Sequence, residues 1–200
     1  MADLASPLTI KDNTANPAPL GLFAFGTTTI LLNLHNAGII NLNMVILSMG
    51  IFYGGLAQVI AGCLEWKKNN TFGATAFTSY GFFWLTLVAI FLLPTFFGTT
   101  MAPDNPSLAW YLLIWGLFTL GLFIGTFRLS VALMVVFGTL TLLFFLLSIE
   151  HFAAPGPGFS KFTGCEGIFC GASACYTGLA LVLNEVYGAM VLPLGLVRKA

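Results

Sequence analysis

The chain has 200 residues, of which seven are Lys or Arg and seven are Asp or Glu, while 58% are hydrophobic. Its mean hydropathy is +0.95. A soluble protein of this size needs many more charged groups on its surface, whereas a protein embedded in a bilayer presents apolar side chains to lipid. The composition therefore excludes an ordinary soluble domain and indicates an integral membrane protein.

Six apolar stretches approach or exceed the roughly 20 residues that a helix needs to cross a bilayer. They cover residues 20–36, 40–64, 72–93, 108–126, 131–149 and 164–187. The runs are continuous rather than alternating, which argues against a transmembrane β-barrel. The connections are short, so neighbouring helices should be antiparallel. We expect an all-α, polytopic bundle of six transmembrane helices over residues 19–197, with an N-terminal tail and helix start at 1–18 and a C-terminal tail at 198–200.

The first stretch is preceded by Asn16, Pro17, Ala18 and Pro19. No basic region leads directly into it and no small-residue cleavage site follows, which argues against a secretory signal peptide. Proline is tolerated where a helix begins, and Asn16 can accept hydrogen bonds from the first free amides. The residues before each proline are restricted to extended conformations, so this segment should be stiff. We expect a cytoplasmic mouth that contains Asn16, Pro17, Pro19, Glu65 and Glu185.

The basic residues are distributed very unevenly between the two sides of a six-span protein. One side receives six of them, and the other receives only Lys161. The six are Lys11, Lys67, Lys68, Arg128, Arg198 and Lys199. Because cytoplasmic loops carry the excess of Lys and Arg, both termini should be cytoplasmic and the protein should lie in the cell inner membrane.

Uncharged polar side chains are the groups inside the spans that could bind a ligand, since no Lys or Arg lies at mid-membrane depth. Phe25, Thr29, Asn33 and Asn36 share one face of a helix. A lone hydroxyl usually bonds to its own helix, but an amide cannot satisfy all its hydrogen bonds in that way. The candidate substrate-binding residues are Thr29, Asn33, Gln58, Thr78 and Ser79.

Several other chemistries are not supported by the sequence. Cys165, Cys170 and Cys175 are five residues apart, which turns each away from the last on a helix, and no Cys-x-x-Cys pair exists. We therefore expect no metal site and no cofactor. No nucleophile–base pair is visible either, so the chain is not expected to be an enzyme. The carboxylates near the membrane surfaces, Glu65 and Glu185 included, are interpreted as solvated helix-end residues.

Glycines recur at intervals of four residues in three places, Gly50 with Gly54, Gly121 with Gly125, and Gly167 with Gly171. Small residues at this spacing let two helix backbones approach closely in a membrane. Packing within one chain is the simpler interpretation. Packing between subunits is the alternative.

Two families share short motifs with the chain. The triplet at residues 16–18, Asn-Pro-Ala, also occurs in the water channels, but those proteins use two such triplets at mid-membrane and an arginine that no span has here. We reject that comparison. A longer set of motifs resembles the acetate uptake transporters, also called succinate–acetate permeases. It begins with NPAPLGL at 16–22 and continues, in the family's order, at 25–26, 31–36, 50–58, 70–73, 77–81 and 182–185.

The resemblance covers almost the whole chain, and the short tails are typical of a prokaryotic member. It implies a six-helix protomer that assembles as a homohexamer, with a narrow path for acetate, succinate and other small carboxylates through each protomer. In the family, a Phe, a Tyr and a Leu form a hydrophobic constriction, and these correspond to Phe25, Tyr80 and Leu140. Channel-like permeation and proton-coupled symport both stay open, and a structural membrane protein without transport is the alternative.

Overall fold

The computed structural model describes residues 14–98 and 102–197. Its elements are α1 (Ala18–Asn36), α2 (Met44–Met49), η1 (Gly50–Ala57), α3 (Gln58–Lys67), α4 (Thr71–Phe97), α5 (Asn105–Thr126), α6 (Val131–Ala153) and α7 (Pro157–Tyr187). The described residues contain one isolated β-bridge, Ser130 to Leu196, and no strand. The all-helical prediction is thus confirmed.

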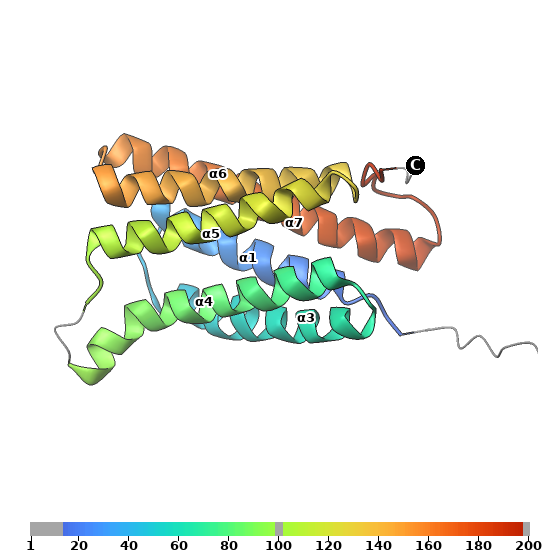
Figure 1. Ribbon diagram of the computed structural model, residues 1–200, viewed down its shortest axis with the longest axis horizontal. Helices are drawn as coiled ribbons and strands as arrows, with labels where there is room; N and C mark the ends of the chain where they lie inside the picture. The colour runs from blue at the N-terminus through green and yellow to red at the C-terminus, as the bar shows by residue number, and fades with distance from the viewer. Residues whose placement is uncertain (1–13, 99–101, 198–200) are drawn as a thin grey trace, which may run out of the picture.

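The helices run along one axis as an antiparallel bundle, with α2, η1 and α3 joined into a single rod (Figure 1). Residues 14–17 and 188–197 lie at one end of the bundle, which we call the terminal end. The opposite end, which carries residues 37–43 and 154–156, is called the far end. The tails at 1–13 and 198–200, with Lys11, Arg198 and Lys199, lie outside the described residues.

In the described part of the chain, five helical rods are long and apolar enough to cross a membrane, namely Met44–Lys67, α4, α5, α6 and α7. The sixth rod, α1, is less apolar because it ends in polar residues. It packs against α7, η1 and α3, and its buried residues include Ala24, Phe25 and Gly26. A helix covered by protein does not need an apolar surface all round. This explains why the first predicted span is the weakest.

Side-chain caps define the helix starts. Asn43, Asn70, Asp104 and Ser130 each accept a hydrogen bond from a backbone amide two or three residues further along, at 2.7–3.2 Å. Such caps satisfy amides that have no partner within the helix. Hydrogen bonds from Ser107 hold the pKa of the exposed Asp104 carboxyl below its usual value. At α1, Asn16 Oδ1 accepts from the amide of Ala18 at 3.0 Å, so the capping role expected of Asn16 is confirmed.

The segment η1 is a π-helix, which the apolar pattern of the sequence did not indicate. Its buried glycines lie against α1 and α4. A Cβ on Gly54 would come within 2.8 Å of Thr28, and a Cβ on Gly50 within 2.6 Å of Val88. The predicted packing role of Gly50 and Gly54 is therefore confirmed within one chain. π-Helical turns often accompany functional sites.

The most extensive helix contact joins α1 and α7. A Cβ on Gly171 would lie 2.6 Å from the carbonyl oxygen of Gly26, and one on Gly167 would lie 2.1 Å from the side chain of Asn33. The prediction that Gly167 and Gly171 pack within the chain is confirmed. The prediction that Gly121 also packs within the chain is wrong, because no described atom lies within 4 Å of the position that its Cβ would take.

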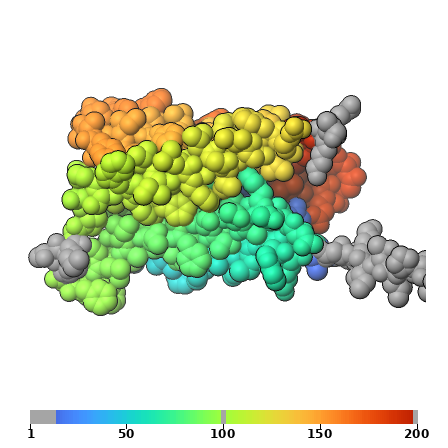
Figure 2. Space-filling view, in the orientation of Figure 1, coloured from blue at the N-terminus to red at the C-terminus, as the bar shows by residue number. Residues whose placement is uncertain are grey.

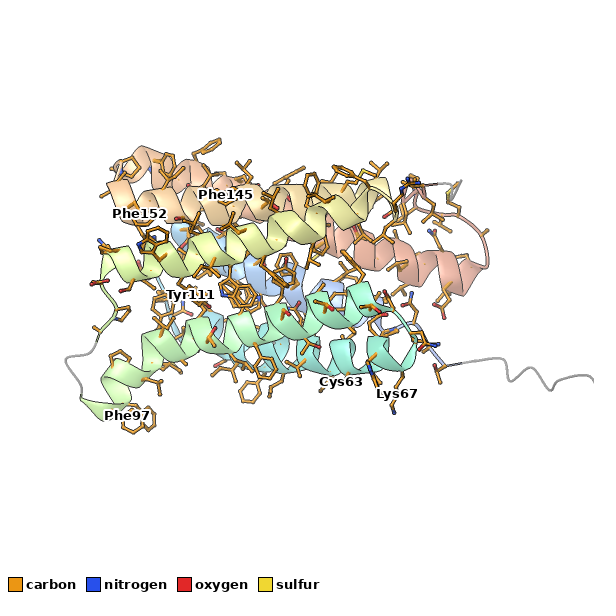
Figure 3. All side chains as sticks on the ribbon, in the orientation of Figure 1. Cys63, Lys67, Phe97, Tyr111, Phe145 and Phe152 are labelled. Atoms are coloured by element: carbon orange, nitrogen blue, oxygen red, sulfur yellow. The ribbon has the colours of Figure 1, made fainter. Side chains whose placement is uncertain are left out.

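Aromatic side chains fill the space between the two halves of the bundle. The ribbons of α4 and α5 are separated, but their side chains meet along this face (Figure 2). Tyr111 points from α5 toward α4 (Figure 3), stacks on Phe83 with ring centroids 5.7 Å apart, and donates a hydrogen bond to the Phe83 carbonyl at 3.2 Å. Rigid aromatic contacts of this kind hold the inner faces of the helices in place.

Candidate functional site

Two cavities open into the bundle from opposite ends. The far-end cavity has a volume of about 240 Å³ and lies among α1, α4, α5 and α6. Its lining begins with His35, Asn36 and His151 near the far end and reaches Phe25 and Leu140 inside. The terminal-end cavity has a volume of about 260 Å³. Its lining includes Ala18, Glu65 and Asn70 near the terminal end and Leu22, Ala76 and Phe137 inside.

The two cavities lie in line because the same three helices form a wall of both. On α1, Leu22 lines the terminal-end cavity and Phe25, one turn further, lines the far-end cavity. On α6, Phe137 lines the terminal-end cavity and Leu140 lines the far-end cavity. On α4, Ala76 lines the first cavity and Phe83 the second, and Tyr80 lies between them along the helix. The cavities are therefore separated by about one helical turn along α1 and α6 and by about two turns along α4.

The barrier between the cavities is made of aromatic rings. Tyr80 lies with its ring centroid 6.0 Å from that of Phe25 and 6.1 Å from that of Phe137. Its hydroxyl donates to Thr119 Oγ1 at 3.0 Å, and Thr119 in turn donates to the carbonyl of Trp115 at 2.7 Å. Phe25, Tyr80 and Leu140 are all buried, with exposed fractions of 7%, 4% and 3%. The three residues assigned to a constriction thus lie in one core cluster.

Polar groups from α1 line one side of the otherwise apolar far-end cavity. Thr29, Asn33 and Asn36 are among its lining residues, as their spacing predicts. Asn33 donates to the carbonyl of Thr29 at 2.9 Å and accepts from Asn36 at 3.0 Å, so it is held rigidly. The hydroxyl of Thr29 and the indole N–H of Trp84 are buried without a hydrogen-bond partner. Both are donors that a ligand could use.

Three of the candidate binding residues lie away from both cavities. Gln58 is fully buried in α3, where its Nε2 donates to the carbonyl of Gly54 at 2.7 Å. Thr78 and Ser79 line a separate, shallow groove between α3 and α4, beside Gly62 and Cys63. Successive residues on a helix differ by about 100° in direction, so neighbours in sequence need not share a cavity. Their placement does not support a substrate-binding role.

Of the residues predicted to form the cytoplasmic mouth, only some lie at the terminal-end cavity. Glu65 lines the terminal-end cavity and is only 2% exposed, so its interpretation as a solvated helix-end residue is wrong. Glu185 is exposed at the end of α7 and does not line that cavity. Asn16, Pro17 and Pro19 shape the start of α1, but the wall of the cavity begins with Ala18.

Sequence reasoning missed Phe137, Thr119 and Trp84. Phe137 and Leu140 are three residues apart on α6, and this spacing could have indicated a shared face. Thr119 and Trp84 had no comparable signal. A threonine or tryptophan in an apolar helix is ordinary until its neighbours on other helices are known.

Comparisons with known proteins agree with this architecture. A sequence profile described as the GPR1/FUN34/yaaH family matches residues 5–196. The chain is 57% identical over 181 residues to the succinate-acetate/proton symporter SatP of Escherichia coli (strain K12), covering 90% of this chain and 95% of that protein. It is 35% identical over 195 residues to acetate permease A of Emericella nidulans, covering 90% of this chain and 65% of that one.

A solved structure of the bacterial acetate channel SatP superimposes with a TM-score of 0.89 at 56% identity, covering 92% of this chain and all of that one. These names describe transporters, a permease and a channel, in agreement with the expectation that the chain is not an enzyme. The family resemblance inferred from the motifs is confirmed. The chain belongs to the GPR1/FUN34/yaaH family of membrane proteins.

Proposed function

We propose that this protein transports acetate, and also succinate and other small carboxylates, along a path through each protomer. The observation that carries the proposal is the pair of cavities in line, separated only by the rings around Phe25 and Tyr80. In this proposal Phe25, Tyr80 and Leu140 form the constriction of the path. The functions in the names of the symporter and the acetate channel support the choice of substrate.

The chemistry of the far-end cavity suits weak binding of a small anion. Among the described residues that line it there is no Lys or Arg. Inside the cavity, beyond His35 and His151 near the far end, a carboxylate is therefore held by uncharged donors. These are the Thr29 hydroxyl, the Trp84 indole and the amides of Asn33 and Asn36. Weak binding allows the anion to leave again, which rapid permeation requires.

Uptake of labelled acetate into sealed vesicles that contain the purified protein tests the function directly. The expected result is saturable uptake well above that of vesicles made without protein, which report the leak of acetic acid through lipid. Uptake equal to the lipid leak would instead favour a structural membrane protein without transport.

The Thr29 hydroxyl offers the cleanest test of binding in the far-end cavity. A hydrogen bond to a charged group contributes about 1.5–3 kcal/mol, so Thr29→Val should raise the acetate concentration for half-maximal uptake roughly 10- to 150-fold. Thr28→Val is the matched control, because Thr28 is buried beside Thr29 but bonds to the Met49 carbonyl and does not line the cavity. Equal half-saturation in Thr29→Val and the wild type would rule out binding through this hydroxyl.

We also propose that the terminal end faces the cytoplasm of a cell whose inner membrane holds the protein. Lys67, Lys68 and Arg128 lie in or beside the connections at the terminal end, whereas Lys161 lies at the start of α7 at the far end. This distribution supports the orientation. A reporter fused after Ala200 should be active only in the cytoplasm, and activity outside the cell would reverse the assignment.

A homohexamer is the proposed assembly. The family resemblance supports it, and Gly121 presents a small residue on an exposed part of α5, where a second helix could approach. The mass of the purified protein in detergent, corrected for bound detergent, should equal six chains. If the protein had the mass of one chain and still transported acetate fully, transport would not require a hexamer.

A further inference from the structure

Among the described residues, Glu65 is the one carboxylate that lines either of the two cavities in line. It is 98% buried in the last turns of α3 and faces the terminal-end cavity. The start of α4 covers it closely, since a Cβ on Gly73 would lie 2.8 Å from the Glu65 carboxyl carbon. A carboxyl group at this place stands directly beside the path that the proposed function assigns to carboxylates.

The two oxygens of Glu65 have different surroundings. Oε2 accepts a hydrogen bond from Asn70 Nδ2 at 2.7 Å, while Oε1 is buried without a partner. Asn70 cannot turn to serve both, because its own Oδ1 accepts from the amide of Gly73 at 3.1 Å and caps α4. The cap thus fixes which atom Asn70 presents to Glu65. Oε1 keeps an unused capacity for one hydrogen bond.

Among the described residues, no cationic side chain donates a hydrogen bond to Oε1 of Glu65. Lys68 acts on Glu65 through its charge, but its Nζ donates to the carbonyl of Thr14. Lys67, Arg128 and Glu185, on α3, the α5–α6 connection and α7, are at the same end and do not line the cavity. The faces of α1, α4, α6 and α7 that line this cavity contribute no ionisable side chain, so Glu65 alone supplies one there.

We propose that Glu65 is a proton-dependent binding residue for the substrate: the terminal-end cavity accepts a carboxylate only when Glu65 carries a proton. The inference rests on the proposed carboxylate path. A protonated carboxyl donates one hydrogen bond, whereas a carboxylate can only accept. Protonated at Oε1, Glu65 therefore offers its O–H to the carboxylate in the cavity while Oε2 keeps the bond from Asn70.

The proton balance of this step is simple. A Glu65 carboxylate and an incoming substrate carboxylate, each with one negative charge, take up one proton from water at the terminal end. The resulting pair shares the proton and carries one negative charge instead of two. Two carboxylates in contact cannot both stay ionised at low cost, so binding and proton uptake are linked. When the substrate leaves, the proton returns to the same water.

Equilibrium exchange of labelled acetate, with equal pH on both sides of vesicles that contain the protein, tests the proposal. Wild-type exchange should fall as the pH rises, approaching tenfold per unit once Glu65 is ionised. In Glu65→Gln the amide N–H donates to the substrate at every pH, and its oxygen still accepts from Asn70. Exchange in this variant should change less than about twofold from about pH 6 to about pH 8.

Glu185→Gln is the control, since Glu185 is a carboxylate at the same end that does not line the cavity; it should keep the wild-type pH profile. A Glu65→Gln profile as steep as that of the wild type would overturn the proposal, because the proton would then travel on the substrate. Flat exchange in the wild type would overturn it as well. Wild-type exchange equal to the lipid leak at every pH would contradict the proposed function instead.

A second measurement uses only the wild-type protein. Carbodiimides react with protonated carboxyl groups, so at neutral pH a carbodiimide should modify Glu65, as mapped by mass spectrometry of its peptide. Acetate should slow the modification of Glu65 more than that of Glu185, because acetate in the cavity covers Glu65 and the Glu185 rate corrects for the carbodiimide that acetate itself consumes. Absence of modification at Glu65, or equal slowing of Glu65 and Glu185 by acetate, would overturn the assignment.

Discussion

Phe25→Ala is expected to raise the flux of succinate relative to acetate by roughly tenfold or more. The Phe25 ring separates the two cavities, and the tightly packed helices around it cannot collapse fully into the space that the ring leaves. Tyr80→Ala should act in the same direction, because Tyr80 bridges Phe25 and Phe137. The measurement is the ratio of labelled succinate to labelled acetate uptake by vesicles that contain each variant.

Phe169→Ala is the matched control for this experiment. Phe169 carries the same ring on α7 but is 57% exposed and lines neither cavity, so its removal should leave the flux ratio unchanged. The constriction would be refuted if Phe25→Ala and Tyr80→Ala both kept the wild-type ratio while eluting as folded protein of wild-type size.

Gly171→Ala adds only one methyl group, but we expect it to destabilise the bundle strongly. The new Cβ would lie 2.6 Å from the Gly26 carbonyl oxygen, and a backbone atom cannot move aside as a flexible side chain does. Because α1 and α7 share the most extensive contact of the bundle, the two helices would have to separate along their length. Overpacking of this kind costs about 1–3 kcal/mol. The expected result is a lower midpoint of thermal unfolding in detergent.

Gly158→Ala provides the comparison on the same helix. No described atom lies within 4 Å of a Cβ at Gly158, so this variant should unfold at or above the wild-type temperature, since Ala favours helix more than Gly does. Equal unfolding midpoints for Gly171→Ala and Gly158→Ala would show that α1 and α7 do not depend on their close approach.

The sequence by itself determined the membrane architecture. Continuous apolar runs identify the spans, because lipid requires helices whose backbone bonds are satisfied internally. The short connections indicate antiparallel neighbours, and the even number of spans predicts that residues 14–17 and 188–197 lie at the same end of the bundle, as they do in the structure. The spacing of Phe25, Thr29, Asn33 and Asn36 also sufficed to place them on one wall of the far-end cavity. These properties are local, or repeat along a single helix.

What surrounds each side chain was decided only by the tertiary structure. Tyr80 and Ser79 are adjacent in the chain, yet Tyr80 enters the barrier between the cavities while Ser79 faces the groove beside α3. Glu65 looked like a solvated helix end, but α4 buries it against a cavity. Both outcomes depend on how each helix is rotated and which helix covers it. That rotation follows from contacts between residues far apart in sequence, and no pattern within one helix contains it.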